Sequence, residues 1–270
     1  MKLAIGGREA SVYTGGKVLD VTLPAVVFVH GAMGDHSVWT LLARWFAHHG
    51  HAVVAVDLPG HSGSDGPALA SVEALADWLL ALLDAAGVAR AAFVGHSMGS
   101  LIALETAARA PHRATQLVMI ATAYPMAVSK ALFDAAERDP HAAIDSVNAF
   151  SHSTIAAKPS YPGPGSWLHG GNRALMRRLQ AAAAGNLFLD DFRVCDRYRG
   201  GLEAAARVTC PATLILGEND QMALPKQTAD LAAALRAEVN RLPAGHAVMS
   251  EAPELVLAAL RQALSPTAAA

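Results

Sequence analysis

Cysteine is scarce in this chain of 270 residues, where Cys195 and Cys210 are the two occurrences. They lie 15 positions apart and form no C-x-x-C pair, so the sequence predicts neither a disulfide framework nor a cysteine-based zinc site. Charge is scarce as well, at 16% of residues against about 25% in a typical soluble protein. The formal net charge is −2 with no long run of one sign, which argues against a nucleic-acid partner.

Long apolar runs are absent too, and none reaches the roughly 18 residues that would predict a membrane span. The first residues reach Gly6, Gly7 and Arg8 before an apolar leader could form, so the sequence predicts a cytoplasmic protein. What the chain does have is 53% apolar residues, which excludes a disordered chain and is enough for a large core. The composition does not decide the oligomeric state.

Short apolar runs recur along the chain, each bounded by polar or turn residues. Continuous runs of this kind are typical of strands buried on both faces of a parallel sheet. They are Ala25–Val29, Ala52–Val56, Ala91–Val94, Leu117–Ala121 and Ala212–Leu216. Helical spacing between them predicts helices over Ser71–Gly87 and Met98–Ala110, and Lys2–Ile5 with Arg8–Thr14 predicts a leading hairpin. This alternation indicates the α/β class, with a mostly parallel sheet flanked by helices.

The alternation stops from residue 123 to residue 199, which predicts a helical cap inserted into a core of residues 1–122 and 200–265. The segment 151–171 is dense in Pro, Gly and Ser, and a loop of this length suggests a gate over a site. Residues 266–270 are expected to be a frayed tail. The helical pieces expected in the cap are Ser129–Arg138, Ala142–Phe150, Asn172–Ala184 and Leu189–Tyr198.

The motif Gly95-His96-Ser97-Met98-Gly99 fits G-x-S-x-G, a pattern that is common by chance. Here it follows an expected strand and opens an expected helix, which is the context of a nucleophile elbow. The two glycines permit a tight turn that projects the serine hydroxyl from the carboxyl end of the sheet. We therefore predict Ser97 as a nucleophile; the alternative is an ordinary turn with a capping serine.

A serine hydroxyl becomes a good nucleophile when a histidine held by a carboxylate removes its proton. Asp220 follows the strand Ala212–Leu216, and His246 follows a modest strand around Val239–Leu242. Both then lie at carboxyl ends of strands, as Ser97 does, where open α/β sheets build their sites. Glu218 is the nearest rival to Asp220 as the acid.

The loop His30–Gly34 follows the strand Ala25–Val29 and carries the sequence H-G-A-M-G. A tetrahedral intermediate needs two fixed N–H donors for its oxyanion. We expect the backbone amides of Met98 and Ala32 to supply them, with Met33 as the alternative to Ala32. The segment Asp57–Gly63, D-L-P-G-H-S-G, is read as a structural turn in which Asp57 accepts hydrogen bonds from backbone amides.

These motifs, in this order, resemble the α/β-hydrolase superfamily over nearly the whole chain. The resemblance implies a mostly parallel eight-stranded sheet flanked by helices, with an inserted helical cap between strands six and seven. It implies a catalytic triad of Ser97, Asp220 and His246, an oxyanion hole of Ala32 and Met98, and no metal or organic cofactor. The family's chain order of serine, acid and histidine leaves His246 as the base, because it is the one histidine late enough in the chain.

An apolar substrate pocket is expected from residues near these motifs in sequence. They are Met33, Trp39, Met126 and Met222, with Trp167 and Tyr161 at the entrance. The expected function is hydrolysis of small-molecule carboxylic esters with small to medium apolar acyl groups. The alternatives are a lactonase or a carbon–carbon bond hydrolase on the same triad, or a non-catalytic binding module. Ser100 and Ala247 depart from the usual carbon–carbon hydrolase pattern.

Overall fold

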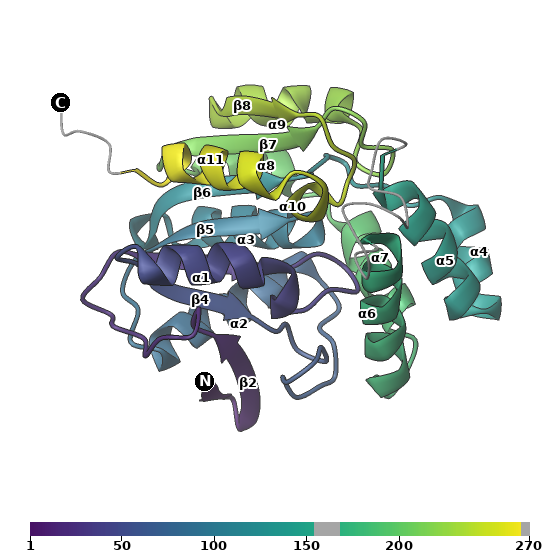
Figure 1. The fold of residues 1–270 in the computed structure, drawn as a ribbon, viewed down its shortest axis with the longest axis horizontal. Helices are drawn as coiled ribbons and strands as arrows, with labels where there is room; N and C mark the ends of the chain where they lie inside the picture. Colours follow the sequence, from purple (N-terminus) through teal and green to yellow (C-terminus); the bar gives the residue numbers. More distant parts are fainter. Residues whose placement is uncertain (154–167, 266–270) are drawn as a thin grey trace.

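An eight-stranded sheet runs through the computed structural model, which describes residues 1–153 and 168–265 (Figure 1). The strand order is β1-β2-β4-β3-β5-β6-β7-β8, with antiparallel pairing at β1–β2 and β2–β4 and parallel pairing elsewhere. The expected mostly parallel sheet is confirmed. Its strands are β1 Lys2–Ile5, β2 Arg8–Tyr13, β3 Ala25–Val29, β4 Ala52–Val56, β5 Ala91–His96, β6 Ala114–Ile120, β7 Ala212–Gly217 and β8 Glu238–Leu242.

Helices cover both faces of this sheet (Figure 1). One face carries α1 (Thr40–His48), α10 (Val248–Glu251) and α11 (Pro253–Ala263). The other carries α2 (Val72–Ala85), α3 (Met98–Arg109), α8 (Gly201–Arg207) and α9 (Ala229–Leu235). Short 3-10 turns are η1 (His36–Trp39), η2 (Pro111–Arg113) and η3 (Pro225–Thr228). None of the helices in the described ranges combines the length and the apolar character needed to cross a bilayer.

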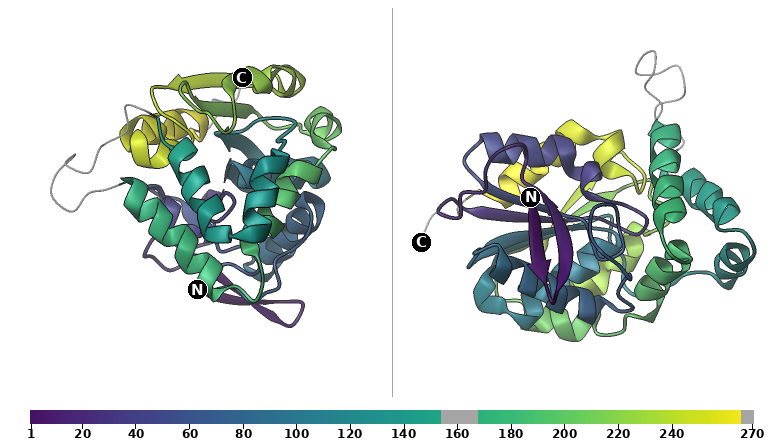
Figure 2. Two further views of the ribbon diagram at one scale, coloured as in Figure 1. Left: turned by 90° about the vertical axis from the view of Figure 1, so that its right-hand side faces the viewer. Right: turned by 90° about the horizontal axis from the view of Figure 1, so that it is seen from below.

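Ahead of α8, four described helices of the segment between β6 and β7 gather beyond the carboxyl ends of the parallel strands (Figures 1 and 2). We call them the helical insertion: α4 Lys130–Arg138, α5 Pro140–Ser151, α6 Leu168–Ala182 and α7 Leu187–Arg197. α6 begins four residues before the expected Asn172 and includes Gly170 and Gly171, although glycine has a weak helix propensity. Most of the expected gate, residues 154–167, and the expected tail, residues 266–270, lie outside the described residues.

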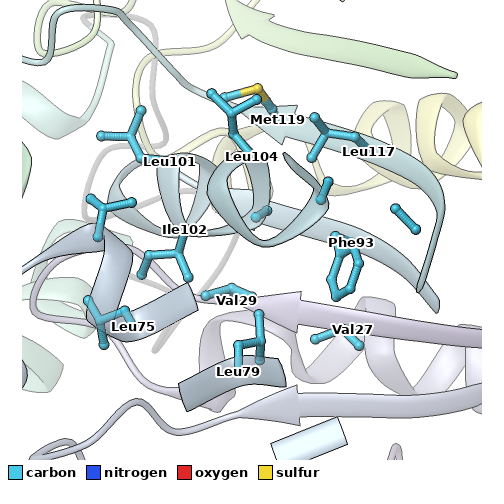
Figure 3. Packing of buried hydrophobic residues seen from close by; sticks show 14 of the residues in the cluster. Val27, Val29, Leu75, Leu79, Phe93, Leu101, Ile102, Leu104, Leu117 and Met119 are labelled. Atoms are coloured by element: carbon cyan, nitrogen blue, oxygen red, sulfur yellow. The ribbon is translucent and has the colours of Figure 1, made fainter. Parts of the chain in front are cut away.

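The core forms because every residue of β3 and β4 is buried and side chains alternate between the two faces. Val27 and Val29 face α2 and α3, whereas Val26 and Phe28 face α1 and α11. Figure 3 shows the first of these clusters, in which Val29 gathers with side chains of both covering helices. Burying each such side chain contributes about 1.5–3 kcal/mol, so the sheet is a rigid platform for residues at its carboxyl edge.

Candidate active site

Ser97 lies between β5 and α3. Its backbone, with φ 52° and ψ −121°, has a conformation that residues other than glycine rarely adopt. Two glycines make this turn fit. A Cβ atom on Gly95 would collide with the carbonyl oxygen of Gly99, and one on Gly99 would collide with the carbonyl oxygen of Val29. The turn is therefore held against the neighbouring strand, and the serine is presented at the edge of the sheet.

His246 links Ser97 to Asp220. Its Nε2 lies 2.9 Å from Oγ of Ser97, and its Nδ1 lies 2.8 Å from Oδ2 of Asp220. The three side chains come from the ends of β5, β7 and β8, and all three residues are buried. The structure thus brings together the three residues that the sequence predicts as a triad.

The Asp220 carboxylate is held by more than the histidine. Its Oδ1 accepts hydrogen bonds from the backbone N–H groups of Met222 at 2.8 Å and Ala223 at 2.9 Å. These bonds leave Oδ2 aimed at His246. Glu218, the rival acid, lies on the same loop but is exposed, as is Asn219, whereas Asp220 is buried.

The loop that carries His246 is fixed on three sides by contacts that the sequence does not predict. Nε2 of His96 bonds the carbonyl oxygen of His246 at 2.9 Å. The Gly245 N–H donates to the Glu251 carboxylate at 3.1 Å, and the Ala247 N–H donates to the carbonyl oxygen of Ser151, at the end of α5, at 2.8 Å. Burial lowers the pKa of His96 to about 3, so this ring is a neutral donor near the base.

The loop His30–Gly34 is fixed by the ring of its first residue. Nδ1 of His30 lies 2.8 Å from the carbonyl oxygen of Gly31, and Nε2 accepts from the N–H of Leu58 at 3.1 Å. Because Nε2 must be an acceptor, the ring is neutral and Nδ1 carries the proton. Burial, with the nearby His61 ring, lowers the pKa of His30 to about 4, which agrees with this tautomer.

Two backbone N–H groups are available beside Ser97. In the part of the chain that the structure describes, the amides of Ala32 and Met98 donate to no protein acceptor. The Met33 amide, the alternative donor, is occupied: it bonds Oδ2 of Asp191 in α7 at 2.7 Å. This difference favours Ala32 over Met33 as an oxyanion donor.

Asp57 takes part in the turn that the sequence predicts. Its carboxylate accepts from the backbone N–H of His36 at 2.9 Å and of Gly63 at 3.3 Å, and it contacts Nδ1 of His36 at 2.7 Å. These bonds tie the end of β4 to the loop after β3. Asp57 therefore holds these two segments together.

A cavity of about 370 Å³ opens beside Ser97 and His246, between the sheet edge and the helical insertion. Most of its wall is apolar, and Ser129, Ser146 and Asn172 add uncharged polar groups. Among the described residues that line it, no side chain is Asp, Glu, Lys or Arg. Its apolar lining includes Met126, Val128, Leu132, Val147, Phe150, Phe192 and Met222.

Two of the expected pocket residues line this cavity and two do not. Met126 and Met222 lie in its wall. The expectation for Trp39 is wrong, because η1 turns its ring into the core, 5.1 Å from the ring of Phe28 and on the α1 face of the sheet. The expectation for Met33 is also wrong: its side chain is buried among the helices of the insertion. Trp167 and Tyr161 lie outside the described residues.

The sequence matches the model of the Alpha/beta hydrolase family over residues 26–259. RutD of Klebsiella pneumoniae (strain 342), a protein named as a carbamate hydrolase, is 30% identical over 216 residues, which cover 75% of each chain. The sn-1-specific diacylglycerol lipase ABHD11 of Mus musculus is 36% identical over 102 residues, which cover 37% of this chain and 33% of the lipase. The chain thus matches only about a third of that relative's length.

Solved structures share the fold over nearly the full length. The enol-lactonase from Burkholderia xenovorans LB400 superposes with a TM-score of 0.82 at 22% identity, covering 98% of this chain and 99% of that chain. At this identity the likeness concerns the fold, and activity has to be argued from the site itself.

Proposed function

The chain belongs to the alpha/beta hydrolase family, and from this premise we propose that it is a serine hydrolase that cleaves carboxylic esters with small to medium apolar acyl groups. One observation carries the proposal: Ser97, His246 and Asp220 form an unbroken hydrogen-bonded relay that opens on an uncharged cavity. A nucleophile, a base and an orienting acid at these distances are the parts that acyl transfer needs.

In the first step, Oγ of Ser97 attacks the ester carbonyl carbon while Nε2 of His246 takes the hydroxyl proton. Asp220 holds the imidazole tautomer and stabilises its charged form. The amides of Ala32 and Met98 donate to the oxyanion of the tetrahedral intermediate. The bond to the alcohol oxygen then breaks, the alcohol leaves with the proton from His246, and the acyl group stays on Ser97.

In the second step, water attacks the acyl carbon and His246 takes one of its protons. The tetrahedral intermediate forms again and breaks at the bond to Oγ, which takes the proton back from His246. The carboxylic acid leaves, and the enzyme is restored. His246 must be neutral to begin each step, so protonation of its ring stops the reaction.

The cavity wall sets the expected preference among esters. An uncharged acyl chain can replace water there, whereas a carboxylate or phosphate would lose its hydration without gaining a cationic partner from the described wall. The flexible side chains of Met126 and Met222 tolerate acyl groups of different shape. We therefore expect neutral p-nitrophenyl esters of intermediate chain length to be hydrolysed fastest.

The test uses purified protein and a panel of p-nitrophenyl esters from acetate to long acyl chains, with Ser97→Ala as the matched variant. Turnover that disappears in Ser97→Ala supports the proposal, and the chain-length profile measures the pocket. A serine-reactive fluorophosphonate reports the nucleophile independently of any substrate. Absence of both labelling and turnover would overturn the proposal in favour of a binding module. Labelling without ester turnover would move the assignment to lactones, carbamates or carbon–carbon substrates.

A further inference from the structure

Asp191 reaches from α7 of the helical insertion to two groups of the core. Its Oδ2 accepts from the backbone N–H of Met33 at 2.7 Å and lies 2.9 Å from Nε2 of His61. The side chains of Asp191 and His61 are 4% and 2% exposed. A buried unpaired charge would be costly, so this carboxylate depends on its two donors. Because both donors belong to the core, the carboxylate attaches α7 to the core.

Met33 needs such an anchor because its backbone is strained, with φ 56° in the left-handed region. This conformation persists only where the surroundings hold it. Ala32, the preceding residue, carries the amide that the proposed mechanism uses for the oxyanion. Release of the Met33 N–H would allow the strained residue to relax, and the direction of the Ala32 amide would change with it.

We propose that Asp191 is a positioning residue for the reaction, which acts through Met33 by holding the Ala32 amide toward the oxyanion. The inference rests on the proposed function. It gives the helical insertion a part in the chemistry besides lining the cavity, since α7 supplies the contact that completes the loop His30–Gly34.

His61 holds the Asp191 side chain in place. Its Nε2 faces the carboxylate and its Nδ1 lies 3.1 Å from the carbonyl oxygen of Pro59, so both ring nitrogens face acceptors, as in an imidazolium. Burial favours the neutral ring, but the charge of Asp191 and its hydrogen bond outweigh burial and raise the pKa of His61. The other titratable groups facing this pair are His30, Asp57 and Cys195.

The experiment compares Asp191→Ala with Asp190→Ala, a matched control at the exposed neighbouring position of the same helix. The measurements are kcat and KM on the best p-nitrophenyl ester, and inhibition by a trifluoromethyl ketone of the same chain length, which forms an oxyanion on Ser97. For Asp191→Ala we expect kcat to fall about 30-fold, with KM within about threefold and the inhibition constant raised by a factor close to the loss in kcat. Asp190→Ala should match the wild type in all three.

Asp191→Asn provides the conservative variant, because its amide oxygen can still accept from the Met33 N–H. Its kcat and its inhibition constant should lie between those of Asp191→Ala and the wild type. If Asp191→Ala does not fold, Asp191→Asn alone provides the test. Its kcat should then fall, and its inhibition constant should rise, by about threefold or more. Wild-type kcat and inhibition in folded Asp191 variants would overturn the inference. Loss of kcat without a change in inhibition would overturn it too. Failure of the proposed function is recognised separately, by a wild type that neither hydrolyses esters nor is labelled at Ser97.

Discussion

At the scale of single residues, hydrogen bonds fix the direction of key side chains in the site. Asp220 uses one oxygen for two backbone amides and the other for His246. His30 is held in one tautomer by a donor on one side and an acceptor on the other. Groups held in this way need little reorganisation during a reaction, which is the physical basis of electrostatic preorganisation.

Replacing Asp220 with Asn tests this assignment at one atom. The amide would keep the size of the side chain, but its NH₂ group could not accept from Nδ1–H, so His246 would favour the wrong tautomer. We expect kcat on p-nitrophenyl esters to fall on the order of 10⁴-fold, with little change in thermal stability. Glu218→Gln, two positions earlier and exposed, is the control and should leave kcat unchanged. Equal activity in the two variants would remove Asp220 from the triad.

At the scale of elements, a single capping residue fixes the point at which α2 begins. Ser71 is the N-cap, and its hydroxyl accepts from the N–H of Ala74 at 3.1 Å. The helix then packs Leu75 and Leu79 against the sheet (Figure 3). The cap thus gives the backbone N–H of Ala74 an acceptor in the first turn of the helix.

Ser71→Ala should lower the free energy of unfolding by about 1 kcal/mol, because the N–H of Ala74 loses its acceptor. Ser71→Asp should retain most of the stability, since its carboxylate can cap the same amide and lies near the positive end of the helix. Urea denaturation of the three proteins measures the difference. An alanine variant as stable as the wild type would mean that water replaces the hydroxyl without loss.

The elements that could be predicted are those whose signal is local. Strands β3 and β4 agree with their expected bounds because both are buried throughout and flanked by turn residues. The triad could be predicted because each member follows a strand end in a short motif. The Asp191–His61 contact could not, because its partners are 130 positions apart and neither lies in a motif that names the other. Trp39 was misplaced because nearness in sequence says nothing about the side of the sheet.

At the scale of the whole molecule, buried histidines connect stability to pH. His30 and His96 are neutral when folded, with pKa values lowered to about 4 and about 3, chiefly by burial. Unfolded histidines take up protons near pH 6.5, so below this pH the unfolded chain binds more protons and stability falls. His61 acts in the opposite sense. Its pKa is raised, so its contribution is present below pH 6.5 and is lost as the pH rises through its folded value.

We expect the free energy of unfolding to fall between pH 6.5 and pH 4, with His30 alone responsible for about 3 kcal/mol. Urea denaturation at intervals across this range measures the slope. His30→Gln should flatten the slope, whatever its effect on stability at pH 7. His112→Gln, at an exposed position, should leave the slope unchanged. A wild-type slope in His30→Gln would assign the acid sensitivity to other groups.

The placement of the helical insertion between two neighbouring parallel strands has a consequence for how such enzymes can diversify. β6 and β7 pair directly, so a different set of helices could be transplanted between them without altering the register of the sheet. The replacement helices must meet two conditions, however. A replacement must still present a carboxylate where Asp191 meets Met33 and a carbonyl where Ser151 meets Ala247. Chimeras that change the pocket and keep these two attachment points should inherit a working site with a new specificity.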